Sequence, residues 1–281
     1  MKKSALVLAA LIVSPQVLAS NHGTHCTGVA GPDLGGDYPR IYEKAAYEAE
    51  YACSLMLSGN PAIAELNAQI AGNPAELPPV AERLPAEPLV IAPYTAIGVH
   101  GGVLDGISKA TEAGTSDLLS VRHTNLVRFS DDLSTIVPNV ASSWQWNDDF
   151  TALTFTLREG HKWSDSDDFT AEDIAFWYNH MILDSNIIES PAERYLSAGE
   201  PMTVVAVDAV TVRFELNAPR PGLLGQIATD YSQYFQPMHL LSQFHPAFNP
   251  EADALAASVG FDSGYEVINF YYGQSDWKDV P

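Results

Sequence analysis

The sequence predicts an α/β fold, a mixed sheet with flanking helices, from its strand patterns and one capped helix. Within residues 151–157, the apolar Leu153, Phe155 and Leu157 alternate with polar threonines. This period of two is typical of a strand with one buried face. Two further strands are predicted over 203–207 and 210–216, the second with strict alternation of apolar and polar side chains. Only two residues separate them, which predicts an antiparallel hairpin.

The helix that supports this fold class follows the first strand. Thr170 is a favourable N-cap residue, and Asp173 stands three positions later, where its carboxylate can reach back to the Thr170 amide. Beyond this capping box, apolar residues recur at helical spacing on one face: Ile174, Trp177, Tyr178, Met181 and Ile182. We therefore predict a helix that begins after Thr170 and has one continuous apolar face.

The first part of the chain predicts a leader and a helical extension over residues 20–72. Apolar residues recur at helical spacing over 38–57, with Glu43 among the acidic residues on the exposed surface. A second, shorter helix is predicted over 62–71. Residues 73–88 contain repeated prolines, which disfavour both helix and strand. We predict a linker there and place the domain boundary at it.

Residues 1–19 have the three parts of a cleavable export signal. Lys2 and Lys3 are positive, residues 5–13 are apolar, and small residues lead to a cleavage site after Ala19. The apolar run is shorter than the roughly 20 residues that a membrane span needs. We expect a periplasmic protein, with an uncleaved anchor as the alternative.

The chain is strongly acidic, with a formal net charge of −21. Removal of Lys2 and Lys3 with the signal leaves 12 basic against 35 acidic residues, a charge of −23. Such a surface repels phosphate backbones, and the sequence contains no basic patch. We therefore expect no nucleic-acid partner.

Cys26 and Cys53 are the two cysteines of the sequence. In an exported protein they are a possible disulfide. Spacing alone does not place their sulfur atoms within bonding distance, so two free thiols remain the alternative.

Residues 22–28, HGTHCTG, resemble the histidine motif of subtilisin-like serine proteases, in which His22 would be the general base. Residues 114–116 similarly resemble the start of the nucleophile motif of that family. A triad needs a carboxylate that orients the imidazole, and the family places it before the histidine. Residues 1–21 contain neither Asp nor Glu, and this missing carboxylate disfavours a working protease.

Two groups of residues could suggest a metal ion. Asp165, Asp167 and Asp168 lack the glycine and the final glutamate of an EF-hand loop, so a solvated turn is the better interpretation. The other group has no evident fourth ligand and consists of His22, His25 and Cys26. No Gly-rich phosphate loop and no convincing catalytic set is present. We expect that the chain binds no metal and no cofactor and that it is not an enzyme.

The stretch 136–177 carries a more specific resemblance. It contains, in order, Pro138, Ser143-Trp144, a TFTLREG run, a KWSD run and an FTAEDI run. These residues resemble the extracellular solute-binding proteins of ABC importers, in the peptide- and nickel-binding family (family 5). Members typically read P-x-L-A-x-S-W and then T-F-x-L-R-x-G-V-x-W-x-D-G-x-P-F-T-A-x-D-V. Ser166 stands where that pattern has glycine.

The resemblance covers roughly residues 89–281 and implies a lobe of the periplasmic-binding-protein type II kind. Members are bilobal and enclose their ligand between two hinged lobes. They are usually about twice as long as this chain, so we expect an incomplete bilobal architecture from which the second lobe is missing. A truncated, non-functional remnant is therefore one alternative.

The family implies a substrate-binding component that captures a small solute and delivers it to the ABC permease subunits, as a monomer and without covalent chemistry. An oligopeptide is the expected solute, with nickel complexes, sugars and opines as alternatives. The positions expected to face the ligand are Glu112, Thr115, Ser116, Asp117, Tyr231, Tyr234 and Phe235.

Overall fold

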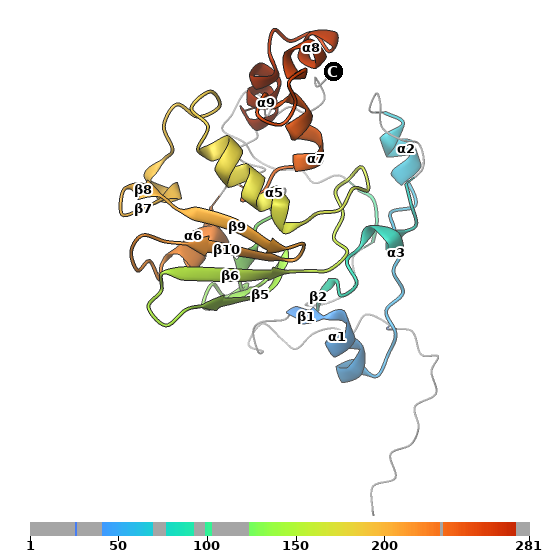
Figure 1. The fold of residues 1–281 in the computed structure, drawn as a ribbon. Coiled ribbons are helices and arrows are strands. Elements are labelled where there is room, and N and C mark those ends of the chain that lie inside the picture. The colour runs from blue at the N-terminus through green and yellow to red at the C-terminus, as the bar shows by residue number, and fades with distance from the viewer. Residues whose placement is uncertain are drawn as a thin grey trace, which may run out of the picture.

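The computed structural model describes residue 26 and residues 41–69, 77–92, 99–102, 124–230 and 233–273 (Figure 1). The α-helices are α1 Lys44–Tyr51, α2 Ile63–Asn67, α3 Val80–Arg83, α5 Ala171–Phe176, α6 Leu223–Thr229, α7 Met238–Leu241, α8 Ala252–Ser258 and α9 Gly264–Gly273. The strands are β1 Ile41–Glu43, β2 Leu89–Ile91, β3 Val127–Phe129, β4 Ile136–Pro138, β5 Ala141–Trp146, β6 Ala152–Leu157, β7 Leu196–Ser197, β8 Glu200–Pro201, β9 Thr203–Asp208 and β10 Thr211–Glu215. A π-helix, η1 Trp177–Ile182, and two 3₁₀ turns, η2 Glu193–Tyr195 and η3 Ser242–Phe244, complete them. Within these ranges, no helix combines the length and the apolar character that a membrane span requires.

A four-stranded antiparallel sheet with the order β5-β6-β10-β9 forms the centre of the lobe. Phe155 on β6 is paired with Trp144 on β5 and with Val212 on β10. Phe155 and Phe214 are fully buried, and their ring centroids lie 5.8 Å apart in an edge-to-face contact. The predicted strand and the predicted hairpin are confirmed.

The predicted capped helix is also confirmed, and it lies over the sheet beside β9 and β10 (Figure 1). The Thr170 hydroxyl accepts from the Glu172 N–H (3.3 Å), and the Asp173 carboxylate accepts from the Thr170 N–H (2.8 Å). The whole apolar stripe is 0% exposed: Ile174, Trp177, Tyr178, Met181 and Ile182. Its second half continues from α5 as the π-helix η1, which the spacing of apolar residues did not predict.

The helices α7, α8 and α9 gather above α5 and form a second, smaller core (Figure 1). Phe176 and Met181, from the far side of α5 and η1, pack there against Phe244 and Ile268. Gly264 is required at the start of α9, because a Cβ at this position would lie 2.0 Å from the Phe244 carbonyl oxygen. The two cores share one continuous helix and so support each other.

The N-terminal segment differs in part from the predicted helix over 38–57. Residues 41–43 form strand β1, which pairs antiparallel with β2, and α1 begins only at Lys44. The helix ends at Ala52, which is left-handed (φ 49°). The predicted second helix is present as the shorter α2. The prediction was wrong over β1 because pairing with a distant strand overrides local helical spacing.

The Pro-rich stretch 73–88 is described from residue 77 onward. Contrary to the expectation of no regular structure, it contains the single helical turn α3 after Pro79, a place where a missing N–H is tolerated. The Arg83 side chain donates to the Pro78 carbonyl (2.8 Å) and holds this turn. Since β1 and β2 pair across the stretch, it connects segments that are in contact with each other.

Cys26 and Cys53 form a disulfide. The Cys26 amide also donates to the Ser54 carbonyl (3.0 Å). The bond ties residue 26 to the end of α1, and it removes Cys26 as a ligand from the metal site considered with His22 and His25.

Candidate functional site

The predicted ligand-facing positions divide into two groups. Five of them lie outside the described residues: Glu112, Thr115, Ser116, Asp117 and Tyr231. The other two, Tyr234 and Phe235, lie in the core of the lobe with exposed fractions of 0% and 7%. Their role in ligand binding stays a prediction, and in this structure they contact other side chains.

Tyr234 belongs to a buried polar network behind α6. Its hydroxyl accepts from the Gln226 amide (2.8 Å) and donates to the Asp230 carboxylate (3.1 Å). Burial first, and the negative charge of Asp230 second, raise the pKa of Tyr234 well above its usual range. The Tyr234 ring packs 4.8 Å from that of Trp177. The hydroxyl is thus satisfied from within the lobe.

An acidic loop, residues 163–168, precedes α5 and carries Asp165, Asp167 and Asp168. Its turn is closed by the Trp163 N–H donating to the Asp167 carbonyl (2.9 Å). Ser166 has φ = 77°, in the left-handed region that favours glycine. The serine therefore sits in a backbone conformation that suits the glycine of the family pattern. Asp168 pairs with Lys162 at the end of the loop.

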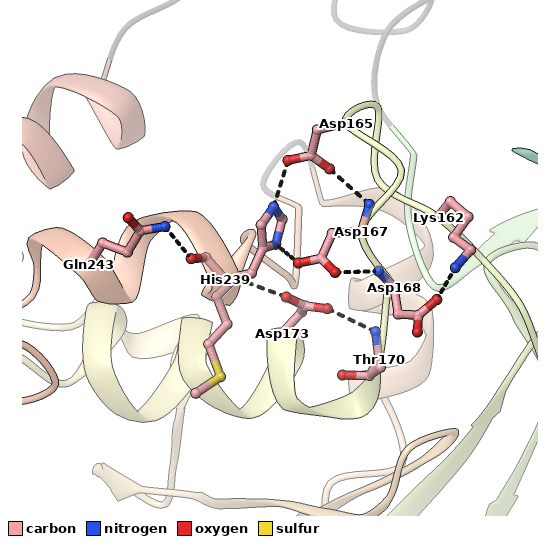
Figure 2. Close-up of polar contacts among 9 residues, drawn as sticks. Lys162, Asp165, Asp167, Asp168, Thr170, Asp173, His239 and Gln243 are labelled. Carbon is pink, nitrogen blue, oxygen red and sulfur yellow. Dashed lines mark hydrogen bonds and ion pairs between the residues drawn. The ribbon is translucent and has the colours of Figure 1, made fainter. Parts of the chain in front are cut away.

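His239, on α7, lies between two carboxylates of this acidic loop (Figure 2). Its Nε2 is 2.6 Å from Asp165 Oδ2, and its Nδ1 is 3.4 Å from Asp167 Oδ2. No role is predicted for His239 from the sequence. Its two partners precede it by more than 70 residues, so no local signal could reveal them. We call these three residues, Asp165, Asp167 and His239, the His239 bridge.

Asp173, on α5, lies beneath the His239 bridge and joins the start of α5 to the start of α7 (Figure 2). One oxygen of its carboxylate accepts from the Thr170 N–H (2.8 Å) at the start of α5, and the other accepts from the Met238 N–H (2.9 Å) at the start of α7. Asp173 is buried, and burial raises its pKa against the opposing effect of these hydrogen bonds. A single side chain thus caps two helices, of which the sequence predicted one.

Arg158, in the TFTLREG run, joins the N-terminal segment to the lobe. Its guanidinium pairs with both carboxylate oxygens of Glu43 and also donates to the carbonyls of Glu87 (2.8 Å) and Asn139 (2.7 Å). We call these four residues the Arg158 cluster. The prediction that Glu43 lies on a helix was wrong, because residues 41–43 form β1. The Glu43 side chain, 39% exposed, pairs with a partner 115 residues away.

A buried histidine joins η1 to the C-terminal helices. His245 Nδ1 accepts from the Ala247 N–H (3.2 Å), which assigns the ring proton to Nε2. That Nε2 lies 3.0 Å from the His180 carbonyl oxygen and 3.3 Å from the Asp184 carboxylate. Asp184 also accepts from the Tyr265 hydroxyl (3.2 Å). These contacts hold η1, η3 and α9 together.

The lowered pKa values of two other histidines lead us to expect that the fold loses stability in acid. Burial first, and the nearby Arg158 second, lower the pKa of His161. Burial first, and His245 second, lower the pKa of His180. The unfolded chain therefore takes up protons below the ordinary value of 6.5, where the folded chain does not. The urea midpoint should fall from pH 7.5 to pH 5. A variant with both His161→Gln and His180→Gln should show a flatter dependence, and an unchanged slope would contradict this origin.

The described part of the chain provides no support for a metal site or for a protease site. Among those residues, no three His, Cys, Asp or Glu side chains are arranged to hold a metal ion. His22 and residues 114–116, which prompted the comparison with subtilisin-like proteases, lie outside the described ranges.

Comparison with known proteins agrees with the resemblance seen in residues 136–177. Residues 135–268 match the family model of bacterial extracellular solute-binding proteins, family 5 middle. The periplasmic α-galactoside-binding protein of Rhizobium meliloti is 32% identical over 196 residues, 62% of this chain and 28% of that protein. The dipeptide-binding protein of Escherichia coli is 29% identical over 136 residues, 43% of this chain and 25% of that protein.

The fold agrees as well. The solved structure of the oligopeptide-binding protein OppA superimposes with a TM-score of 0.67 at 27% identity, over 81% of this chain and 35% of that one. The chain thus spans about a quarter to a third of the proteins that it matches. These relatives are binding proteins, and the family is extracytoplasmic. The segment 135–268, and with it the lobe built on the four-stranded sheet, belongs to the family 5 bacterial extracellular solute-binding proteins.

Proposed function

We propose that this chain is part of the substrate-binding component of an ABC importer and takes up an oligopeptide-like solute outside the cytoplasmic membrane. The match of residues 135–268 to the solute-binding family carries this proposal. The fold shared with an oligopeptide-binding protein over 81% of this chain supports the choice of solute. Delivery of the solute to membrane permease subunits and export by the signal at residues 1–19 are parts of the same proposal.

In this proposal the lobe is a scaffold that presents one wall of a cleft. Tyr234 and Phe235 support that wall from within, because both are buried and Tyr234 is hydrogen-bonded to Gln226 and Asp230. Direct contacts to the solute then come from the remaining predicted positions: Glu112, Thr115, Ser116, Asp117 and Tyr231. A site of this kind works by capture and hinge closure, with no covalent step.

An oligosaccharide is the second candidate solute. The α-galactoside-binding protein matches 62% of this chain at 32% identity, whereas the dipeptide-binding protein matches 43% at 29%. The relation to a sugar-binding protein is therefore longer and somewhat closer. The buried residues of the lobe contact other side chains, so they support both solutes equally.

Ligand-observed saturation-transfer NMR on the purified chain tests the proposal, because it detects the millimolar affinity expected of one wall of an enclosing site. The probes are tripeptides of mixed sequence and an α-galactoside oligosaccharide such as stachyose. The control is the same measurement in glucose-free buffer with bovine albumin in place of the chain. Transfer to the tripeptides alone is the expected result. Transfer to the oligosaccharide alone would replace the peptide by the second candidate, and transfer to neither would contradict solute binding by this lobe.

A further inference from the structure

The His239 bridge places an imidazole between two carboxylates, an arrangement that the proposed function does not explain. Figure 2 shows the imidazole of His239 with one ring nitrogen toward Asp165 and the other toward Asp167, at 2.6 Å and 3.4 Å. A neutral imidazole has one N–H donor and one lone pair, whereas an imidazolium has two donors. Nε2 is hydrogen-bonded to Asp165, whereas Nδ1 lies 3.4 Å from the Asp167 carboxylate without a hydrogen bond, so this second carboxylate attracts the ring only when both nitrogens carry protons. With the ring neutral, one carboxylate would face a lone pair.

We propose that the His239 bridge is a proton-dependent latch, in which the imidazolium holds the acidic loop against α7 and loss of its proton releases the loop. The bridge connects two segments that are distant in sequence and both within the region matched to the family, 135–268. Protonation supplies the attraction, so the loop is held in acid and loosened as the pH rises.

The charges around His239 support this assignment. Asp165 and Asp167 face it from the acidic loop, and Asp173 from α5 adds a third negative charge nearby. The one cation beside the loop in the described ranges, Lys162, is paired with Asp168. From α7 and η3, the contact is the uncharged Gln243 amide, which donates to the His239 carbonyl (2.9 Å). The charged groups that face the ring are thus predominantly negative.

Asp165 responds in the corresponding way. Its partial burial acts to raise the pKa, but the hydrogen bonds from His239 and from the Asp167 amide outweigh burial and lower it. Asp165 is thus kept as a carboxylate, the form that an imidazolium partner requires. The Asp167 amide donates to Asp165 (3.1 Å), and the Asp168 amide donates to Asp167 (3.0 Å), so these two amides report on the order of the loop.

Release of the bridge should leave the lobe folded. Asp173 still joins α5 to α7 through the Thr170 and Met238 amides, and it lies beneath the exposed loop (Figure 2). The side chains of Asp165 and Asp167 are about half exposed, at 55% and 52%. The consequence is therefore local: the acidic loop changes its order with pH while α5 and the sheet do not.

Hydrogen exchange of the intact chain, measured by NMR between pH 5.5 and pH 8.5, tests the latch. The protection factors of the Asp167 and Asp168 amides, corrected for intrinsic exchange, should fall about threefold with rising pH, the size that two partly exposed ion contacts support. Amides of β6 should show no such local change. His239→Gln should remove the pH dependence, and Asp165→Asn, in the exposed loop, should weaken it without unfolding the lobe.

The matched control is His100→Gln, which removes an exposed histidine from the described range 99–102 and should leave the pH dependence intact. Addition of salt should reduce the change in protection, because these charges are partly exposed. Protection factors in the unmodified chain that do not change with pH would overturn the proposal. So would an unchanged pH dependence in His239→Gln.

Discussion

Replacement of Glu43 by glutamine is expected to lower the free energy of unfolding by about 2–4 kcal/mol. The substitution removes one charge and leaves the Arg158 guanidinium, whose side chain is 3% exposed, without a carboxylate partner. Loss of one partner from a fully buried ion pair costs roughly 3–5 kcal/mol. The effect here should be smaller, because the Glu43 side chain is 39% exposed and Arg158 keeps the carbonyls of Glu87 and Asn139.

Urea denaturation followed by circular dichroism measures this loss. Glu50→Gln is the matched control, since it removes the same charge from an exposed position of α1 and should change stability by only a few tenths of a kcal/mol. A double variant with Glu43→Leu and Arg158→Met should recover much of the loss, because neither charge is then left unpaired. Equal effects of Glu43→Gln and Glu50→Gln would show that the Arg158 cluster does not stabilise the fold.

Replacement of Asp173 by alanine is expected to lower the free energy of unfolding by about 2–4 kcal/mol. The side chain accepts from the Thr170 and Met238 amides, and each hydrogen bond to a charged group contributes roughly 1.5–3 kcal/mol. The sum is reduced because burial of the carboxylate itself is unfavourable, as the raised pKa of Asp173 indicates. Thermal and urea unfolding both measure the change.

The neighbouring Glu172→Ala provides the control, because Glu172 is exposed on the same turn of α5. Asp173→Asn should lie between the two, since an amide keeps one oxygen acceptor but points its NH₂ group at the second N–H donor. If Asp173→Ala lowered the free energy of unfolding by no more than the loss of a single exposed N-cap side chain does, the contact with the Met238 amide would not contribute to stability.

The elements that the sequence predicted are those whose cause is local. Strand β6 follows from the alternation of Leu153, Phe155 and Leu157 with threonines, and α5 follows from a capping box that spans the four residues from Thr170 to Asp173. In both elements, the spacing of apolar side chains (two in the strand, three to four in the helix) indicates which face is buried. The family resemblance of residues 136–177 spans these same scaffold elements, whereas the predicted ligand-facing positions lie outside that stretch and stay predictions.

The features that the sequence did not predict depend on partners that are distant in the chain. Residues 41–43 have helical spacing, but they form β1 because β2 and Arg158 supply pairing partners. The second cap made by Asp173 lies 65 residues further along. Such contacts exist only once the chain has folded.

Hydrogen exchange across the Arg158 cluster tests most directly whether the N-terminal segment and the family 5 lobe form one folding unit. The paired β1 and β2 amides should be protected together with those of β5, β6 and β10, and Glu43→Gln should lower protection in β1 and β2 well before it affects β6. Exchange of β1 and β2 at the rate of an unstructured peptide, with the four-stranded sheet still fully protected, would contradict that unity.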